Sequence, residues 1–264
     1  MNVPRESLCL AAIALLMLPA LPSQAQPVTT KTVNIQSPDA TPVGQLHFPF
    51  THRFALFGSK VTSSPTFALS TGVHSRTSVG LRYATSSDVN SSRPGAFNEW
   101  EPGITHMGLS TAAGNRVDAT GILAYNTAAG STDAALVLGR PWGAVSLLGT
   151  AKAFSNGYGE GPKAALGAGI RWEITRYLQV SADLNGVVAG GMPSGTLPAW
   201  SVGTAFEIPY TPHSVSLYMT NANTHTLEGT SRGTSQVRGG FEFLVPFTSW
   251  GRWAAIFSTP RESR

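Results

Sequence analysis

The 264-residue chain has 12% charged and 42% hydrophobic residues and a formal net charge of +4. Ordinary soluble domains have roughly 25% charged residues, so this chain lacks the charges of a normal water-exposed surface, and it also lacks the apolar excess of a large core. Its basic residues are scattered along the sequence and form no patch, so we expect no nucleic-acid partner.

Residues 1–25 read as a signal peptide. Arg5 precedes the apolar stretch 8–21, and small residues then predict cleavage after Ala25. An uncleaved membrane anchor is the competing interpretation, but two prolines interrupt a run that is short for a spanning helix. The only cysteine, Cys9, lies in this leader. Disulfides, thiol catalysis and cysteine metal sites are therefore excluded for the mature chain.

After the leader, three regions are distinguished by composition. Residues 26–45 are rich in Thr, Pro, Gln and Ser and have no sustained apolar row, which predicts a flexible periplasmic lead-in. Residues 46–257 carry the repeated strand pattern described next, with either Phe247 or Phe257 closing the last strand. Residues 258–264 form a polar tail.

The strand pattern is a strict alternation of apolar and polar residues. It is clearest over 177–187, where Leu178, Val180 and Leu184 alternate with polar side chains. We predict twelve strands: 46–57, 66–74, 76–85, 98–110, 116–126, 133–139, 143–154, 163–173, 177–189, 199–208, 213–222 and 235–246.

The predicted connections alternate between short ones, such as 174–176, and generally longer ones, such as 155–162 and 223–234. Bacterial outer-membrane barrels have short periplasmic turns and longer external loops. The fold prediction is an all-β protein: a single closed antiparallel transmembrane β-barrel of about twelve strands, with ten to fourteen compatible with the pattern. Its expected location is the bacterial outer membrane.

Charged residues fall on the face opposite to the apolar row. A basic side chain that faced lipid at mid-depth would cost about 2–4 kcal/mol, so this face is expected to line the lumen. Five cations and five anions are predicted there: Arg76, Arg82, Lys152, Arg171, Arg238, Asp118, Glu173, Asp183, Glu207 and Glu242. Two interpretations stay open, namely a narrow lumen filled by paired charges and a water-filled route for small polar solutes.

The first predicted strand contains His52, Arg53 and Phe54, and a strand with Val79-Gly80-Leu81 follows. In these features the chain resembles a family of bacterial outer-membrane β-barrels, itself uncharacterised, that has a His-Arg-Phe signature in its first strand. The resemblance implies the barrel fold. It implies no activity.

The sequence gives little indication of a catalytic site or a metal site. Ser155-Asn156-Gly157 is similar to a phospholipase motif, but the position of the general base holds Ala153. His74 and His213 sit at predicted short turns, whereas His225 belongs to a long loop, so they share no proton path. No two histidines have a metal-ligand spacing with acidic companions. We predict no catalytic residues, no metal and no cofactor.

The predicted function is that of an outer-membrane barrel without catalysis, acting as a narrow channel, a solute-binding barrel or a structural envelope protein. Its expected partners are outer-membrane lipid, the barrel-assembly machinery and small polar solutes. Two alternatives remain: a lipid-acting outer-membrane hydrolase or deacylase, and a soluble periplasmic ligand-binding β-barrel.

Overall fold

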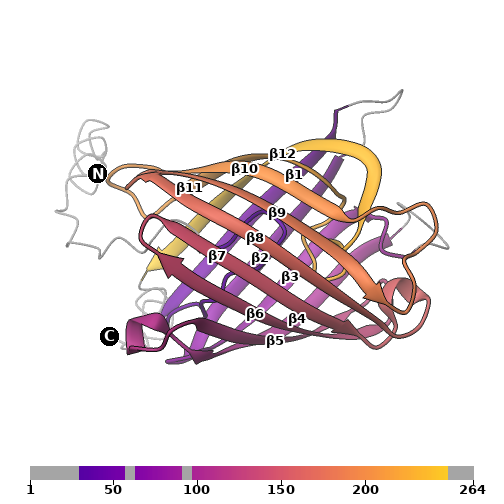
Figure 1. The fold of residues 1–264 in the computed structure, drawn as a ribbon, viewed down its shortest axis with the longest axis horizontal. Coiled ribbons are helices and arrows are strands. Elements are labelled where there is room, and N and C mark those ends of the chain that lie inside the picture. Colours follow the sequence, from indigo (N-terminus) through magenta and orange to yellow (C-terminus); the bar gives the residue numbers. More distant parts are fainter. Residues whose placement is uncertain (1–29, 57–62, 91–96, 249–264) are drawn as a thin grey trace, which may run out of the picture.

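The computed structural model describes residues 30–56, 63–90 and 97–248. Within them, twelve antiparallel strands form a closed barrel in which each strand pairs with its neighbours in sequence and β1 pairs with β12 (Figure 1). The predicted fold class is confirmed. The strands are β1 (Gln45–Ala55), β2 (Ser63–His74), β3 (Thr77–Ser87), β4 (Phe97–Leu109), β5 (Asp118–Asn126), β6 (Ser131–Trp142), β7 (Val145–Phe154), β8 (Lys163–Thr175), β9 (Leu178–Ala189), β10 (Ala199–Glu207), β11 (Ser214–Ala222) and β12 (Gly233–Thr248).

Two short 3₁₀ turns, η1 (Thr111–Ala113) and η2 (Gly157–Gly159), complete the described elements. None of the described helical segments is long and apolar enough to cross a membrane. The predicted signal peptide and polar tail lie outside the described residues, as does the part of the predicted barrel after residue 248.

Some strand ends differ from the sequence prediction. Positions 140–142 were expected to form a turn, but β6 continues through Trp142, which pairs with Val145 of β7. The turn is made by the two residues between them, and Gly143 supplies the positive φ of 60° that such a tight hairpin needs. At the closure of the barrel, Phe247 pairs with Leu46. Of the two predicted closing aromatics, Phe247 therefore lies in the last strand.

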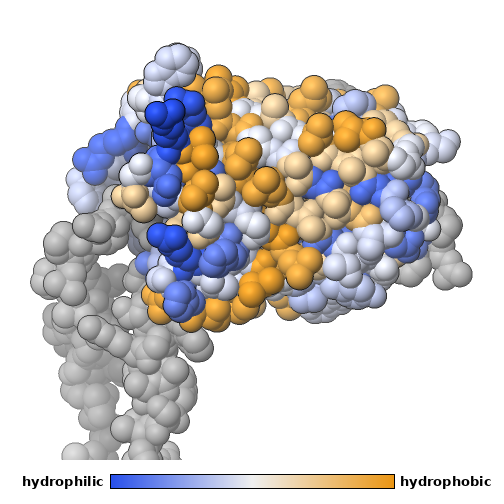
Figure 2. Space-filling model, turned by 60° about the horizontal axis from the view of Figure 1, so that its bottom comes forward, coloured by the Kyte–Doolittle hydropathy of each residue, from blue (hydrophilic) through white to orange (hydrophobic). Residues whose placement is uncertain are grey.

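The strands separate apolar and polar side chains to opposite faces. In β6, Leu136 and Leu138 are exposed on the outside of the barrel. Val137, which lies between them, and Asp133, earlier in the strand, are buried inside. Hydrophobic side chains cover much of the visible wall, and hydrophilic ones gather toward both ends (Figure 2). This is the distribution expected of a wall that faces lipid in its middle.

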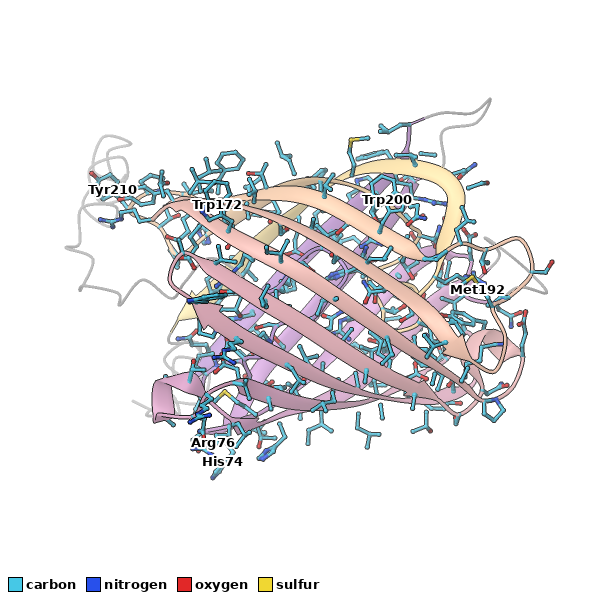
Figure 3. The ribbon with its side chains drawn as sticks, viewed as in Figure 1. His74, Arg76, Trp172, Met192, Trp200 and Tyr210 are labelled. Carbon is cyan, nitrogen blue, oxygen red and sulfur yellow. The ribbon has the colours of Figure 1, made fainter. Side chains whose placement is uncertain are left out.

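Aromatic side chains lie toward both ends of the barrel. Trp172 and Tyr210 lie at the end with the short turns, and Trp200 lies toward the end with the long loops (Figure 3). Interfacial aromatic belts of membrane barrels have this placement. We call these the short-turn end and the long-loop end.

Two chain segments fill the lumen. Residues 30–42, the N-terminal insert, enter from the short-turn end, and Thr32 to Gln36 are buried there. Residues 223–232, the loop insert, connect β11 to β12, and every one of them is buried. The sequence predicted a flexible periplasmic lead-in over 26–45 and an external loop over 223–234. The described parts of both segments instead pack inside the barrel, because their polar groups find partners on the wall.

Candidate functional site

The candidate site is the middle of the lumen, where the two inserts meet. The Nε2 atom of His225 lies 3.0 Å from the backbone oxygen of Val33. Leu227 and Ile35 belong to one apolar cluster with inward-facing side chains of β5 to β8. The guanidinium of Arg53 donates hydrogen bonds to both inserts. These contacts join the two inserts to each other and to the wall in the middle of the lumen.

Glu99 on β4 is the main wall anchor of the loop insert. Its carboxylate accepts hydrogen bonds from Thr224 (2.9 Å) and Thr226 (2.5 Å) of the insert. It also accepts from Ser87 (2.8 Å) and Asn126 (2.5 Å) on neighbouring strands. Four donors on one buried carboxylate satisfy the charge that burial would otherwise penalise.

Lys152 on β7 and Glu101 on β4 hold the same insert from two parts of the wall. The Nζ atom of Lys152 donates to the carbonyl of Leu227 (3.2 Å) and to the hydroxyls of Thr230 (2.9 Å) and Ser231 (3.0 Å). Glu101 accepts the backbone N–H of Leu227 (2.7 Å) and pairs with Arg82. The turn of the loop insert is therefore clamped between β4 and β7.

Glu228 of the loop insert lies near three other acidic side chains, Asp133, Glu99 and Glu101. Its carboxylate accepts the backbone N–H of Tyr158 at 2.6 Å, while one of its oxygens and one oxygen of Asp133 lack a hydrogen-bond donor. Glu228 is outside the spanning strands, and burial, reinforced by the charge of Asp133, raises its pKa. Burial likewise raises the pKa of the Tyr158 hydroxyl. A proton shared between Glu228 and Asp133 would supply the missing donor.

Burial also lowers the pKa of His225, with the nearby cations Lys31 and Arg53 adding to the effect. The imidazole is therefore neutral when it contacts Val33. A neutral ring requires no counter-ion at the junction of the two inserts.

Asn34 makes more hydrogen bonds to the wall than any other residue of the N-terminal insert. Its backbone N–H and side-chain amide donate to the two carboxylate oxygens of Asp183 at 2.9 and 3.0 Å. Its side-chain oxygen accepts from Arg53 at 3.2 Å. Lys31 adds an ion pair with Glu242 at 2.6 Å. A small cavity of about 20 Å³ is lined by Lys31, Glu242 and His225, among others. It has room for about one water molecule.

The structure places the ten predicted lumen residues in three groups. Six lie in the interior, buried or partly buried: Arg82, Lys152, Arg171, Asp183, Arg238 and Glu242. Three lie near strand ends: Asp118 binds Thr111, Glu173 is half-exposed and pairs with Arg171, and Glu207 ends β10. Arg76 is outside the lumen. It lies in the turn between β2 and β3 and is exposed at the barrel end (Figure 3), because β3 begins one residue later.

The three residues of the His-Arg-Phe signature divide between the two faces. Arg53 points inward and is buried. His52 and Phe54 point outward with ring centroids 3.9 Å apart, and His52 is hydrogen-bonded to Ser63 at 2.5 Å. That these three residues mark a family of outer-membrane barrels stays a prediction.

Sequence reasoning missed the acidic wall made by Glu99, Glu101 and Asp133, and the lumenal role of Arg53. The period-two signal was present, since Glu99 and Glu101 alternate with outward-facing Trp100. Glu228 had no such signal, because the loop insert has no alternation. Among the described residues, no group of three His, Cys, Asp or Glu side chains could hold a metal ion.

No protein-family model matches the sequence, and no curated protein is similar to it in sequence. Solved structures do resemble the fold. The structure titled "KdgM porin" matches with a TM-score of 0.54 and 8% identity, covering 76% of this chain and 99% of that one. A structure of the NanC porin matches with a TM-score of 0.50 and 9% identity, covering 77% and 99%. At such low identities the likeness concerns the fold alone: this chain has the architecture of a porin barrel.

Proposed function

We propose that this protein is a narrow outer-membrane channel for small polar solutes, closed in the described conformation by its two inserts, and that it has no catalytic role. One observation carries the proposal. The lumen of this twelve-stranded barrel is filled by two chain segments, whereas wall side chains alone fill the interior of a barrel of about eight strands. A chain segment that is weakly held, as the N-terminal insert is compared with the loop insert, can move as a unit, which side chains fixed on strands cannot.

Four further features support the proposal. The outer wall is apolar and the lumen is polar, as in membrane barrels. Both solved structures described above carry the word porin in their titles. The predicted signal peptide, cleaved after Ala25, fits export toward the outer membrane, where lipid and the barrel-assembly machinery would be its partners. The mixture of cations and anions in the lumen favours weak ion selectivity.

Planar-bilayer recording tests the proposal directly. The wild-type protein should give small currents of weak selectivity. Replacing residues 223–232 by Asn-Gly should raise the conductance several-fold, because Ala222 and Gly233 are already paired and a two-residue hairpin can join them. A matched control shortens the exposed β9–β10 loop by residues 194–195, which should leave the conductance unchanged.

Location is tested separately. The protein should be recovered in the outer-membrane fraction and should show heat-modifiable migration on gels. Recovery as a soluble periplasmic monomer would refute the proposal. Silence of both the wild type and the shortened variant, with insertion into the bilayer demonstrated, would favour a structural role.

A further inference from the structure

Arg53 is a buried cation whose hydrogen-bond partners are neutral. It is 1% exposed. Its guanidinium donates to the carbonyl of Thr224 (2.7 Å) and to the side-chain oxygen of Asn34 (3.2 Å). Both acceptors belong to the inserts, and the Nε atom has no acceptor. Among the described residues no carboxylate lies within ion-pair distance of it. A buried guanidinium normally binds a carboxylate through its planar fork of donors.

Asp183 is the matching buried anion. Its carboxylate accepts from Ser201 at 2.5 Å and from Asn185 at 3.2 Å on the wall. The other two donors come from Asn34 of the N-terminal insert. Within the described part of the chain no cation lies within ion-pair distance of Asp183. The carboxamide of Asn34 thus sits between a cation and an anion that are not joined to each other.

The side-chain amide of Asn34 presents an acceptor to Arg53 and a donor to Asp183. It donates in addition to the hydroxyl of Thr220 at 3.2 Å. An acceptor and a donor side by side are also what the carboxylate and ammonium of an α-amino acid offer. In the bonds of Asn34 only the wall group is charged. A zwitterion would form ion pairs with both wall groups, because donor and acceptor would then both be charged.

We propose that Arg53, Asp183 and Thr220 form a binding site for small zwitterions of the α-amino-acid type, and that Asn34 occupies this site as a built-in substitute ligand. The solute carboxylate binds Arg53 and its ammonium binds Asp183. This inference rests on the proposed function, since the N-terminal insert must move to admit a solute. Binding of the zwitterion then competes with reinsertion of Asn34.

The competition sets the expected affinities. A tethered group competes at an effective concentration on the order of millimolar, so the wild type should bind a free zwitterion weakly. Asn34→Ala removes the substitute while leaving both wall charges in place. Because the fraction of open sites rises, the apparent affinity for the zwitterion should increase at least ~10-fold.

Isothermal titration of the full-length, folded protein with glycine measures this. Asn34→Ala should bind glycine at least ~10-fold more tightly than the wild type. In the same variant, acetate and methylammonium should bind at least ~10-fold more weakly than glycine, because each satisfies only one wall charge. Equal binding of acetate and glycine would overturn the assignment, as would the absence of any glycine binding.

Wall variants in the Asn34→Ala background locate the site. Arg53→Lys keeps the charge but loses the fork of donors, and Asp183→Asn removes the anion, so both should lose glycine binding. Lys163→Gln is the matched control, since Lys163 is a buried cation whose hydrogen bonds and ion pair go to Gly190, Gly191 and Glu160, outside both inserts. Loss of binding in this control, or retention in both wall variants, would refute the site.

Titration measures glycine binding and does not depend on an ionic current. The binding site and the channel are therefore tested independently. A conducting protein that does not bind glycine would overturn the site and leave the channel. A silent protein that binds glycine would overturn the channel and leave the site.

Discussion

The two inserts fill the same lumen but are held very differently. Every residue of the loop insert is buried, and charged groups of Glu99, Glu101 and Lys152 fix it to two walls. The N-terminal insert has an exposed residue, Asp39, and four of its hydrogen bonds involve Asn34, with single charged contacts at Lys31 and Gln36. A fully buried segment with more charge-assisted bonds behaves as part of the folded barrel, whereas one with fewer can open locally. We therefore expect the N-terminal insert to be the movable one.

The largest effect should come from the main anchor of the loop insert. Glu99→Leu leaves buried donors of four residues without an acceptor, and an unsatisfied buried donor costs about 1–3 kcal/mol. We expect a loss of at least about 3 kcal/mol in the free energy of unfolding, measured by urea denaturation from vesicles. Glu173→Leu, at a half-exposed carboxylate, should cost under about 1 kcal/mol. Similar losses of unfolding free energy in both variants would show that Glu99 is no stronger an anchor than a half-exposed carboxylate.

A smaller and local effect should follow from the anchor of the N-terminal insert. Asn34→Ala removes three side-chain hydrogen bonds. We expect the closed position of the insert to lose about 2 kcal/mol, which is about a 30-fold rise in the open population. Lys31 lies in this insert, so the rate of tryptic cleavage after Lys31 reports the opening. Global unfolding should change much less, and a change of equal size would show that both inserts open together.

Raising the pH should loosen the loop insert. The pKa of Glu228 lies above its ordinary value of 4.5 because of burial, so the folded protein favours the protonated form. As the pH rises above that ordinary value, the unfolded chain loses the proton first, and stability falls. Between pH 6 and pH 9 we expect a loss of up to about 1.4 kcal/mol per pH unit, seen as a lower temperature for the heat-modifiable gel shift.

Glu228→Gln should flatten this pH response, because the amide cannot ionise. The groups that face Glu228 are Asp133 on β6, Glu99 and Glu101 on β4, and Tyr158, over whose ring Arg232 lies. A response that persisted unchanged in the variant would assign it to one of these groups instead.

The smallest effect should be at the exposed position of the N-terminal insert. Asp39→Ala changes a solvent-exposed side chain, so we expect less than about 0.5 kcal/mol in unfolding and little change in cleavage after Lys31. A large increase in cleavage would mean that Asp39 contributes to holding the insert, and would weaken the special role of Asn34.

The sequence by itself predicted the barrel, the number of strands and the faces of most of them. These features follow from the alternation of side chains along each strand, which is local and repeats with the period of the backbone. The lumenal positions of Lys152, Asp183 and Glu242 were predicted for the same reason. Arg76 was misplaced because the strand began one residue later than expected, and strand ends carry the weakest local signal.

Only the tertiary structure decided where the two inserts lie. Their Thr, Ser and Asn residues have the composition of a solvated loop, and a polar lumen satisfies the same hydrogen bonds that water would. Arg53 and Asp183 could not be assigned to one site either, since they lie on β1 and β9 and are joined through Asn34 of a third segment. Contacts between residues far apart in the chain leave no periodic trace in sequence. The alternating sequence pattern of each strand therefore determines the barrel wall. The filling of the lumen depends on hydrogen bonds between polar groups that are far apart in the chain.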